Sequence, residues 1–442
     1  MRTNSCARTL RSFPRGAPLF VALLGLLGCG TLRATMHGYE MGPAGIARPQ
    51  HRLREALAHE DFKTALGWRE DDALLRALNT GVSSYYAMQF ARSAAVLDSA
   101  ALMADDRITT SVSRNGLALL TNDLARAYQP RRTERLFIAY YGMLAYARLE
   151  QWEDAAVEAR RLSALLTQFA PDRADGERAT HATLHSLAGA IFERAGERGE
   201  ADVAFRNARA LEPSAPNADW RSARGGGEVL VVVERGFVAH RVTESINVFL
   251  GDAEQDSLRG DGDPRRPRRP RGSDDDGGYW LAVAFPALRR SEHPQVGEPT
   301  LVVDGAAAQA SRMASVLDDA VAADERRERS SFITRAIVRA VAKHVVTKAV
   351  KDKQGDVAGT IVNISASLLE RADVRSWHLL PQELTLLRVR VPSGARSMRL
   401  QLGDAADGRI VELGTVNVRP GMTTIASVRL WNDVPPKIVA VR

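Results

Sequence analysis

One segment of the chain, residues 181–213, spaces small and aromatic residues in a way that few folds can accommodate. Its small residues recur at intervals of 12 and 7, with a phenylalanine 3 residues after the first and 4 residues after the second. Small side chains at these points let two antiparallel helices approach closely, and the aromatic rings fill the groove between them. The residues concerned are Gly189, Phe192, Gly196, Ala201, Phe205, Ala208 and Pro213. The spacing therefore predicts a helical hairpin closed by a proline.

These seven residues fall at positions 8, 11, 15, 20, 24, 27 and 32 of a tetratricopeptide (TPR) repeat. Two weaker copies lie upstream, and their matching residues are Tyr146 and Ala155, then Tyr85, Ala94 and Ala101. The position-20 alanines are 61 and 46 residues apart, so the array is irregular. About three repeats make a stable stack, and residues 51–216 are predicted to form a TPR-like helical solenoid. An ordinary alanine-rich helical bundle is the alternative.

Beyond residue 224 the pattern changes from helix to strand. Residues 225–236 read GGGEVLVVVERG, a run of β-branched residues after three glycines that is typical of a buried strand. Shorter strands are expected at 241–250, 279–285 and 300–303. These strands define a β-rich segment at 225–303.

A charged insert at residues 256–278 interrupts this segment. It is rich in proline, arginine and aspartate and cannot bury a core, so a disordered loop is predicted. The alternative is that its basic half, followed by three aspartates at 274–276, contacts a polyanion or calcium.

The remaining chain combines one more helical segment with a run of strands. Residues 306–372 return to a helical pattern, and within 329–353 apolar residues follow one side of a long helix while arginine and lysine follow another. Such a helix packs its apolar side on a sheet, or alternatively lies on a membrane surface. Five short strands in residues 380–442 predict a β-sandwich-like domain, completed by the strands of 225–303. The expected fold class is α+β: an irregular TPR-like α-helical solenoid, then a mixed domain with a long helix and a C-terminal antiparallel β-sandwich-like sheet.

The N-terminus carries the features of a bacterial lipoprotein signal. Four arginines and no acidic residue precede the apolar run LFVALLGLLG, which is too short to span a bilayer. Residues 26–29, Leu-Leu-Gly-Cys, resemble the lipobox at which a cysteine is acylated. Residues 1–28 are thus expected to be removed, Cys29 to be the lipid attachment site, and residues 29–50 to form a flexible tether. An ordinary signal peptide with a chance cysteine is the alternative.

The composition fits an envelope location. The chain has two cysteines, and Cys6 lies in the predicted signal, so the mature chain keeps no pair for a disulfide. Gly30 stands where an aspartate would retain many lipoproteins at the inner membrane, which favours the periplasmic face of the outer membrane of a Gram-negative bacterium. Removal of four arginines lowers the net charge from +7 to +3, which gives no case for nucleic acid as a partner.

The segment before the C-terminal strands carries a family resemblance. Its residues fit the form E-x-A-D-x-R-x-W-x-x-L-P and are Glu370, Ala372, Asp373, Arg375, Trp377, Leu380 and Pro381. With residues 332–344 and 144–161, the segment resembles a family of uncharacterised, TPR-bearing envelope lipoproteins of Gram-negative bacteria. The resemblance implies lipoprotein topology and a helical-repeat half followed by a mixed half, with no assigned catalytic residues. An Asp373–Arg375 ion pair and a buried Trp377 are expected to act as a junction latch; a ligand groove is the alternative.

No motif of catalysis stands out. His181 and His185 are four residues apart, but Ala182 replaces the glutamate of the H-E-x-x-H metal motif. The chain has no G-x-S-x-G, no phosphate-binding glycine loop and no C-x-x-C. We therefore expect no enzyme activity, metal, cofactor or small-molecule substrate.

The expected function is that of a non-enzymatic envelope lipoprotein, held at the membrane by its lipid anchor, which binds other envelope proteins through its helical repeats. A stack of helix pairs presents its concave face on a rigid frame, which suits extended or helical partners. Two alternatives remain: a peptidoglycan-active enzyme or a cofactor of one, and a structural subunit of an export or surface-assembly machine. Whether the repeats bind a peptide or only brace the β half is open at this stage.

The lipobox generates a direct prediction. Cys29→Ser is expected to accumulate as unprocessed precursor and to take up no labelled palmitate, because the acyl acceptor sulfur is gone. Metabolic labelling followed by immunoprecipitation measures both effects. Normal palmitate incorporation in this variant would show that Cys29 is not the lipid attachment site.

Overall fold

The computed structural model describes residues 48–113, 127–171, 176–215, 226–250, 279–291, 297–354, 372–403, 409–431 and 440–441. The predicted signal, Cys29, almost the whole tether and the insert 256–278 lie outside the described residues. The chain divides into Met1–Arg48 and Pro49–Arg442, and the description below concerns the second unit.

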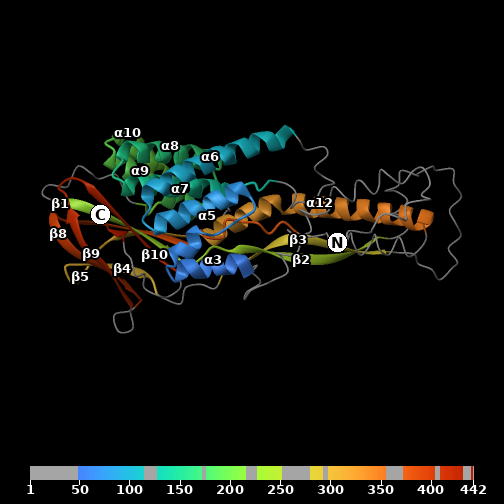
Figure 1. Ribbon diagram of the computed structural model, residues 1–442. Coiled ribbons are helices and arrows are strands. Elements are labelled where there is room, and N and C mark those ends of the chain that lie inside the picture. Colours follow the sequence, from blue (N-terminus) through green and yellow to red (C-terminus); the bar gives the residue numbers. More distant parts are fainter. Residues whose placement is uncertain are drawn as a thin grey trace, which may run out of the picture. The chain divides into compact units, whose positions relative to one another are not determined.

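The N-terminal part of this unit is helical and the C-terminal part is built around sheets, which confirms the predicted α+β class (Figure 1). The helices pack in chain order, each against the next, from α4 to α10. They are α3 (Arg48–Ala58), α4 (Phe62–Leu66), α5 (Ala73–Tyr86), α6 (Phe90–Ser113), α7 (Arg132–Arg148), α8 (Trp152–Gln168), α9 (Arg178–Arg194) and α10 (Arg198–Leu211).

Four helical hairpins share one turn. In each turn a residue with positive φ is followed by a residue whose N–H donates to the carbonyl oxygen five positions back, which is a Schellman-type helix end. The positive-φ residues are Glu60 (55°), Met88 (58°), Glu150 (60°) and Gly196 (83°). The corresponding N···O distances are 2.7 Å for Asp61–Ala56, 2.8 Å for Gln89–Ser84, 3.0 Å for Gln151–Tyr146 and 2.8 Å for Glu197–Phe192.

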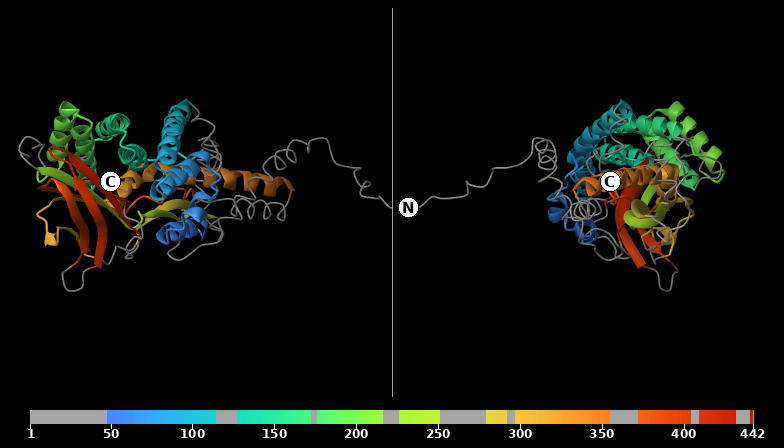
Figure 2. Two further views of the ribbon diagram at one scale, coloured as in Figure 1. Left: turned by 60° about the vertical axis from the view of Figure 1, so that its left-hand side comes forward. Right: turned by 90° about the vertical axis from the view of Figure 1, so that its right-hand side faces the viewer.

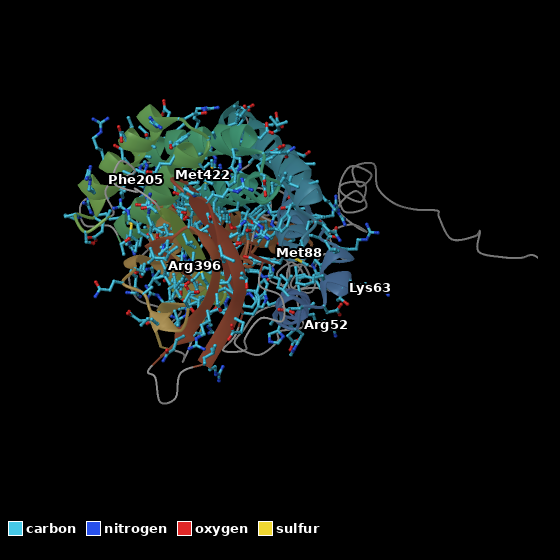
Figure 3. All side chains as sticks on the ribbon, turned by 90° about the vertical axis from the view of Figure 1, so that its left-hand side faces the viewer. Arg52, Lys63, Met88, Phe205, Arg396 and Met422 are labelled. Carbon is cyan, nitrogen blue, oxygen red and sulfur yellow. The ribbon has the colours of Figure 1, made fainter. Side chains whose placement is uncertain are left out.

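This shared turn fixes the register of the repeats. With Glu150 and Gly196 at position 15, Tyr146 and Phe192 both occupy position 11, as the spacing predicts. In the first copy the turn residue is Met88, labelled in Figure 3, so the register moves by one and Ser84 occupies position 11 in place of Tyr85. The hairpin α3–α4 is a further, shortened unit that sequence analysis missed, because its second helix spans only five residues.

The hairpin α9–α10 shows why the spacing matters. A Cβ atom on Gly189 would lie 2.8 Å from Cζ of Phe205, so only glycine permits this approach of the two helices. Ala201 and Ala208 are fully buried between them, and Phe192 is 1% exposed. The two packing residues predicted in the preceding hairpin differ in burial. Ala155 on α8 is fully buried, whereas Tyr146 on α7 is half-buried and donates its hydroxyl to Asp98 at 2.6 Å.

A five-stranded sheet, in the order β11–β10–β1–β7–β6, forms the centre of the unit. Its middle strand β1 (Gly226–Arg235) pairs in parallel with β10 (Thr423–Leu430) and antiparallel with β7 (Glu383–Pro392). The edges are β6 (Ser311–Val316) and β11 (Ala440–Val441). This sheet is therefore mixed, because β1, from before the long helix, lies between two C-terminal strands and pairs in parallel with β10. The C-terminal strands β8 and β9 pair antiparallel, as predicted.

The apolar run of β1 is buried on both faces. Val229, Val231 and Val233 pack against a second sheet, while Leu230 and Val232 pack with the helices. The second sheet has the order β5–β4–β8–β9, with β5 Ala306–Ala307, β4 Pro299–Val303, β8 Gly394–Leu402 and β9 Arg409–Val418. Helices, five-stranded sheet and four-stranded sheet thus form successive layers (Figure 2).

A separate two-stranded ribbon pairs β2 (His240–Leu250) with β3 (Tyr279–Arg289) and contacts the long helix α12 (Leu317–Gln354). No helix in the described part of the chain combines the length and apolar character needed to cross a bilayer.

The predicted helical segment 306–372 is wrong at its start. Residues 306–307 and 311–316 are the strands β5 and β6, and α12 begins at Leu317, whose N–H donates to the carbonyl oxygen of Gln382 at 2.7 Å. The physical reason is that Met313 and Ser315 are buried while Arg312 and Ala314 are exposed, the period of two that marks a strand. Residues 355–371 lie outside the described part of the chain.

Because position 20 of the hairpin α9–α10 admits only a small side chain, Ala201→Trp is expected to lower the free energy of unfolding by about 1–3 kcal/mol or more. Urea denaturation followed by circular dichroism measures the loss. Val203→Trp, on the same helix but with the valine 42% exposed, is the matched control and should be close to neutral. Equal stability of the two tryptophan variants would contradict the packing role of Ala201.

Candidate functional site

The first helices of the hairpins are enclosed on two sides. Thirteen of the 17 residues of α9 and 14 of the 17 residues of α7 are buried, against 7 of 17 in α8 and 4 of 14 in α10. The difference arises because α7 and α9 lie between the second helices and the five-stranded sheet, whose inner apolar residues belong to the same core. Along α7 and α9 the sheet therefore occupies the face that a free repeat array would offer to a partner.

The predicted latch residues attach the strand-entry segment to the helices. The Arg375 guanidinium donates to Asp373 at 2.8 and 2.7 Å and lies 4.0 Å from Asp72, the N-cap of α5. Trp377 is 1% exposed, and its backbone N–H donates to Glu134 Oε1, in the first turn of α7, at 2.7 Å. These contacts tie residues 373–377 to two hairpins; a latch function for them stays a prediction.

A buried glutamate joins the sheet to the first helices. Glu234 lies on β1, is fully buried, and accepts hydrogen bonds from the hydroxyls of Tyr86 (2.7 Å), Tyr141 (2.8 Å) and Tyr140 (3.1 Å). Burial raises the pKa of all three tyrosines well above its usual value, and the charge of Glu234 adds to this effect, so they act as neutral donors.

Arg429 on β10 completes this cluster. Its guanidinium lies 3.8 Å from Glu234, donates to the carbonyl oxygens of Gly236 and Leu379, and stacks 4.7 Å from the ring centre of Trp431. Sequence analysis missed the cluster, although a glutamate following four buried valines and a leucine is a signal for a paired buried charge.

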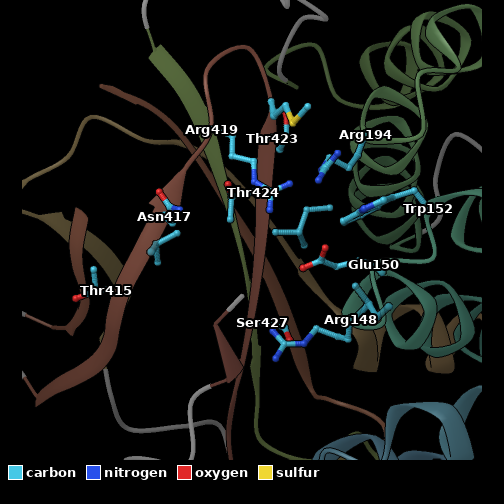
Figure 4. A pocket seen from close by; sticks show the side chains of 15 residues that line it. Arg148, Glu150, Trp152, Arg194, Thr415, Asn417, Arg419, Thr423, Thr424 and Ser427 are labelled. Carbon is cyan, nitrogen blue, oxygen red and sulfur yellow. The ribbon is translucent and has the colours of Figure 1, made fainter. Parts of the chain in front are cut away.

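Beside this cluster lies an open cleft of about 260 Å³ between helices and strands (Figure 4). Its helix side includes the end of α7, the turn into α8 and the end of α9; its strand side includes β9, β10 and the turn between them. The lining residues are Leu144, Ala147, Arg148, Glu150, Trp152, Arg194, Thr415, Val416, Asn417, Arg419, Met422, Thr423, Thr424, Ile425 and Ser427.

Three arginines and one carboxylate line the cleft, so its lining is positively charged. Arg194 stacks over Trp152 at 4.4 Å and points toward Arg419, which extends from the strand side (Figure 4). Burial and then the charge of Arg419 lower the pKa of Arg194, while Glu150 opposes the shift. Arg148 is 8% exposed and packs over Phe90 at 5.0 Å.

Strand edges also meet at the cleft. Within the described residues β9 pairs only with β8, and β11 pairs with β10 only at Ala426 and Ser427. The N–H of Glu228 donates to the carbonyl oxygen of Met422 at 3.0 Å. In a parallel pair, successive residues of a strand direct their backbone groups alternately toward and away from the neighbouring strand, so Met422 and Thr424 face β1. The backbone groups of Thr423 and Ile425 consequently face away from β1.

The two histidines of the sequence motif lie inside α9. His181 and His185 are 3% and 5% exposed, and burial lowers the pKa of His185 to about 4. Within the described residues, no three histidine, cysteine or acidic side chains come together in a way that could hold a metal ion.

No family model and no curated protein matches the chain. Among solved structures, a chain described as "MamA MSR-1 C2" is similar over 37% of this chain and 95% of that chain, with 15% identity and a TM-score of 0.16. A likeness at this level supports no argument about fold or function. The resemblance to envelope lipoproteins stays a prediction.

The Glu234 cluster generates a stability prediction. Glu234→Gln is expected to cost about 3–5 kcal/mol of unfolding free energy, because the buried Arg429 loses its carboxylate. Glu412→Gln, on an exposed site of β9, is the control and should be nearly neutral. Denaturant titration compares them; a small loss for Glu234→Gln would show that the ion pair and its tyrosines do not hold the helices to the sheet.

Proposed function

We propose that this protein is a non-enzymatic scaffold of the cell envelope that binds another protein at the arginine-lined cleft. Its lipid would be attached at Cys29, on the basis of the lipobox, and the lipidated end would hold it at the periplasmic face of the outer membrane. The TPR-like array would brace the sheet and supply one wall of the binding site.

The choice of the cleft as the binding site rests on which surfaces are covered and which are open. The sheet covers the inner faces of α7 and α9, whereas the cleft is open and combines charged side chains, hydroxyls and strand edges. Its volume of about 260 Å³ is below the roughly 300–1,000 Å³ typical of small-molecule pockets. An open site of this size suits a short segment of a larger partner.

The composition of the cleft favours binding over hydrolysis of cell-wall glycan. Glycoside hydrolysis generally needs a pair of carboxylates flanking the scissile bond. Among the residues lining the cleft, Glu150 is the one carboxylate. The peptidoglycan-enzyme alternative therefore receives no support from this cleft.

A photocrosslinking amino acid at Asn417, on the strand side of the cleft, tests the proposal in living cells of the bacterium that makes the protein. We expect a discrete crosslinked product that contains one envelope protein. The same amino acid at Val203, on the outer face of α10, is the matched control and should give no such product.

Two results would contradict the proposal. One is equal crosslinking from both positions or none from the cleft. The other is release of muropeptides from purified sacculi by the purified mature protein, which would indicate an enzyme.

A further inference from the structure

We infer that the cleft binds an extended acidic polypeptide segment, which adds as a strand to the edge of β10 at Thr423 and Ile425 and places its carboxylates between Arg194 and Arg419. This inference rests on the proposed function and specifies the chemistry of the bound segment.

The charges of the cleft indicate an anionic group. Arg194 and Arg419 point toward one another from opposite walls, and after burial the charge of Arg419 is the next cause that lowers the pKa of Arg194. Among the residues that line the cleft, Glu150 is the one acidic side chain near Arg194 and Arg419. Carboxylates entering from a ligand would relieve this repulsion and form charge-assisted hydrogen bonds with the guanidinium groups.

The backbone of β10 indicates that the ligand is extended. Thr423 and Ile425 direct their N–H and C=O groups away from β1, and the pairing of β11 stops at Ala426 within the described residues. A strand edge of this kind accepts an added strand through main-chain hydrogen bonds. β11 itself pairs antiparallel at the adjacent residues, so a segment beside Thr423 and Ile425 would continue an existing line of pairing.

The side walls fit a peptide better than a free anion. Arg194 stacks over Trp152 on the helix side, and Thr415 and Asn417 on β9 supply polar side chains on the strand side. A peptide strand presents side chains alternately to its two faces, so one face would meet the arginines and the other would meet β9.

Binding of a fluorescein-labelled peptide of about ten residues, alternating threonine and glutamate, to the purified mature protein tests the inference by fluorescence anisotropy. We expect measurable binding that weakens about tenfold or more in Arg194→Gln and in Arg419→Gln, the effect of losing one charge-assisted hydrogen bond. Arg206→Gln, an exposed arginine on the outer face of α10, is the matched control and should bind normally. Glu150→Gln should strengthen binding, since it removes the competing carboxylate.

Two altered peptides separate charge from strand addition. The threonine–glutamine peptide lacks the charges and should bind at least tenfold more weakly. A threonine–glutamate peptide with N-methylated backbone amides on one edge keeps the charges but cannot pair as a strand there, and it should also lose binding. Thermal melting of each protein variant establishes that it is folded.

Each contrary outcome has a distinct meaning. Failure of the threonine–glutamate peptide to bind, or binding unaffected by the cleft variants, overturns the inference, while crosslinking at Asn417 would leave the proposed function standing. Full displacement of the peptide by inorganic phosphate near the peptide concentration, or equal binding of the N-methylated peptide, would show a simple anion site without strand addition. Loss of both peptide binding and crosslinking would overturn the inference and the proposed function together.

Discussion

The architecture depends on one buried carboxylate. Glu234 lies on the central strand, where three tyrosine hydroxyls and a guanidinium converge on it, and it is inaccessible to water. A buried charge is costly unless its hydrogen bonds are satisfied, so this residue requires the first helices to lie where their tyrosines can reach it. Apolar packing alone would allow the helices to slide over the sheet; the Glu234 cluster favours one position.

This docking changes the role of the helical repeats. In a free-standing array the first helices of each pair line an open concave surface. Here α7 and α9 are buried on both sides, and additional contacts extend the attachment: Tyr85 bonds to Ser427 at 2.8 Å, and Arg388 bonds to Glu193 at 2.6 Å. The repeats thus pack against the sheet, and the cleft lies at the rim where their turns approach the strands.

The cleft follows from that arrangement. The turn after α7 and the end of α9 bring Trp152 and Arg194 opposite the turn before β10, and the edges of two sheets end at the same place. None of these elements forms the cleft by itself. Arg194 and Arg419 come to face one another only because two layers meet there.

Local periodicity in the sequence was sufficient to predict the strongest elements. Gly189, Phe205 and Ala201 specify the last hairpin because their sizes alone determine how closely two helices approach. The run VLVVV specifies a doubly buried strand because β-branched residues without polar alternation suit a sheet covered on both faces. Sequence periodicity did not identify two short elements. The helix α4 is too short to show a helical period, and Ser311–Val316 is a strand of six residues that a helix follows directly.

Only the tertiary structure decided what these elements do together. The three tyrosines that donate to Glu234 lie 93, 94 and 148 residues away along the chain, and the walls of the cleft are still farther apart in sequence. Periodicity shows which face of an element is apolar, but it does not show which other apolar face will cover it. The parallel pairing of β1 with β10, the covered face of the repeats and the arginine-lined cleft all arise from that choice of partner, which is set by the burial of the whole unit.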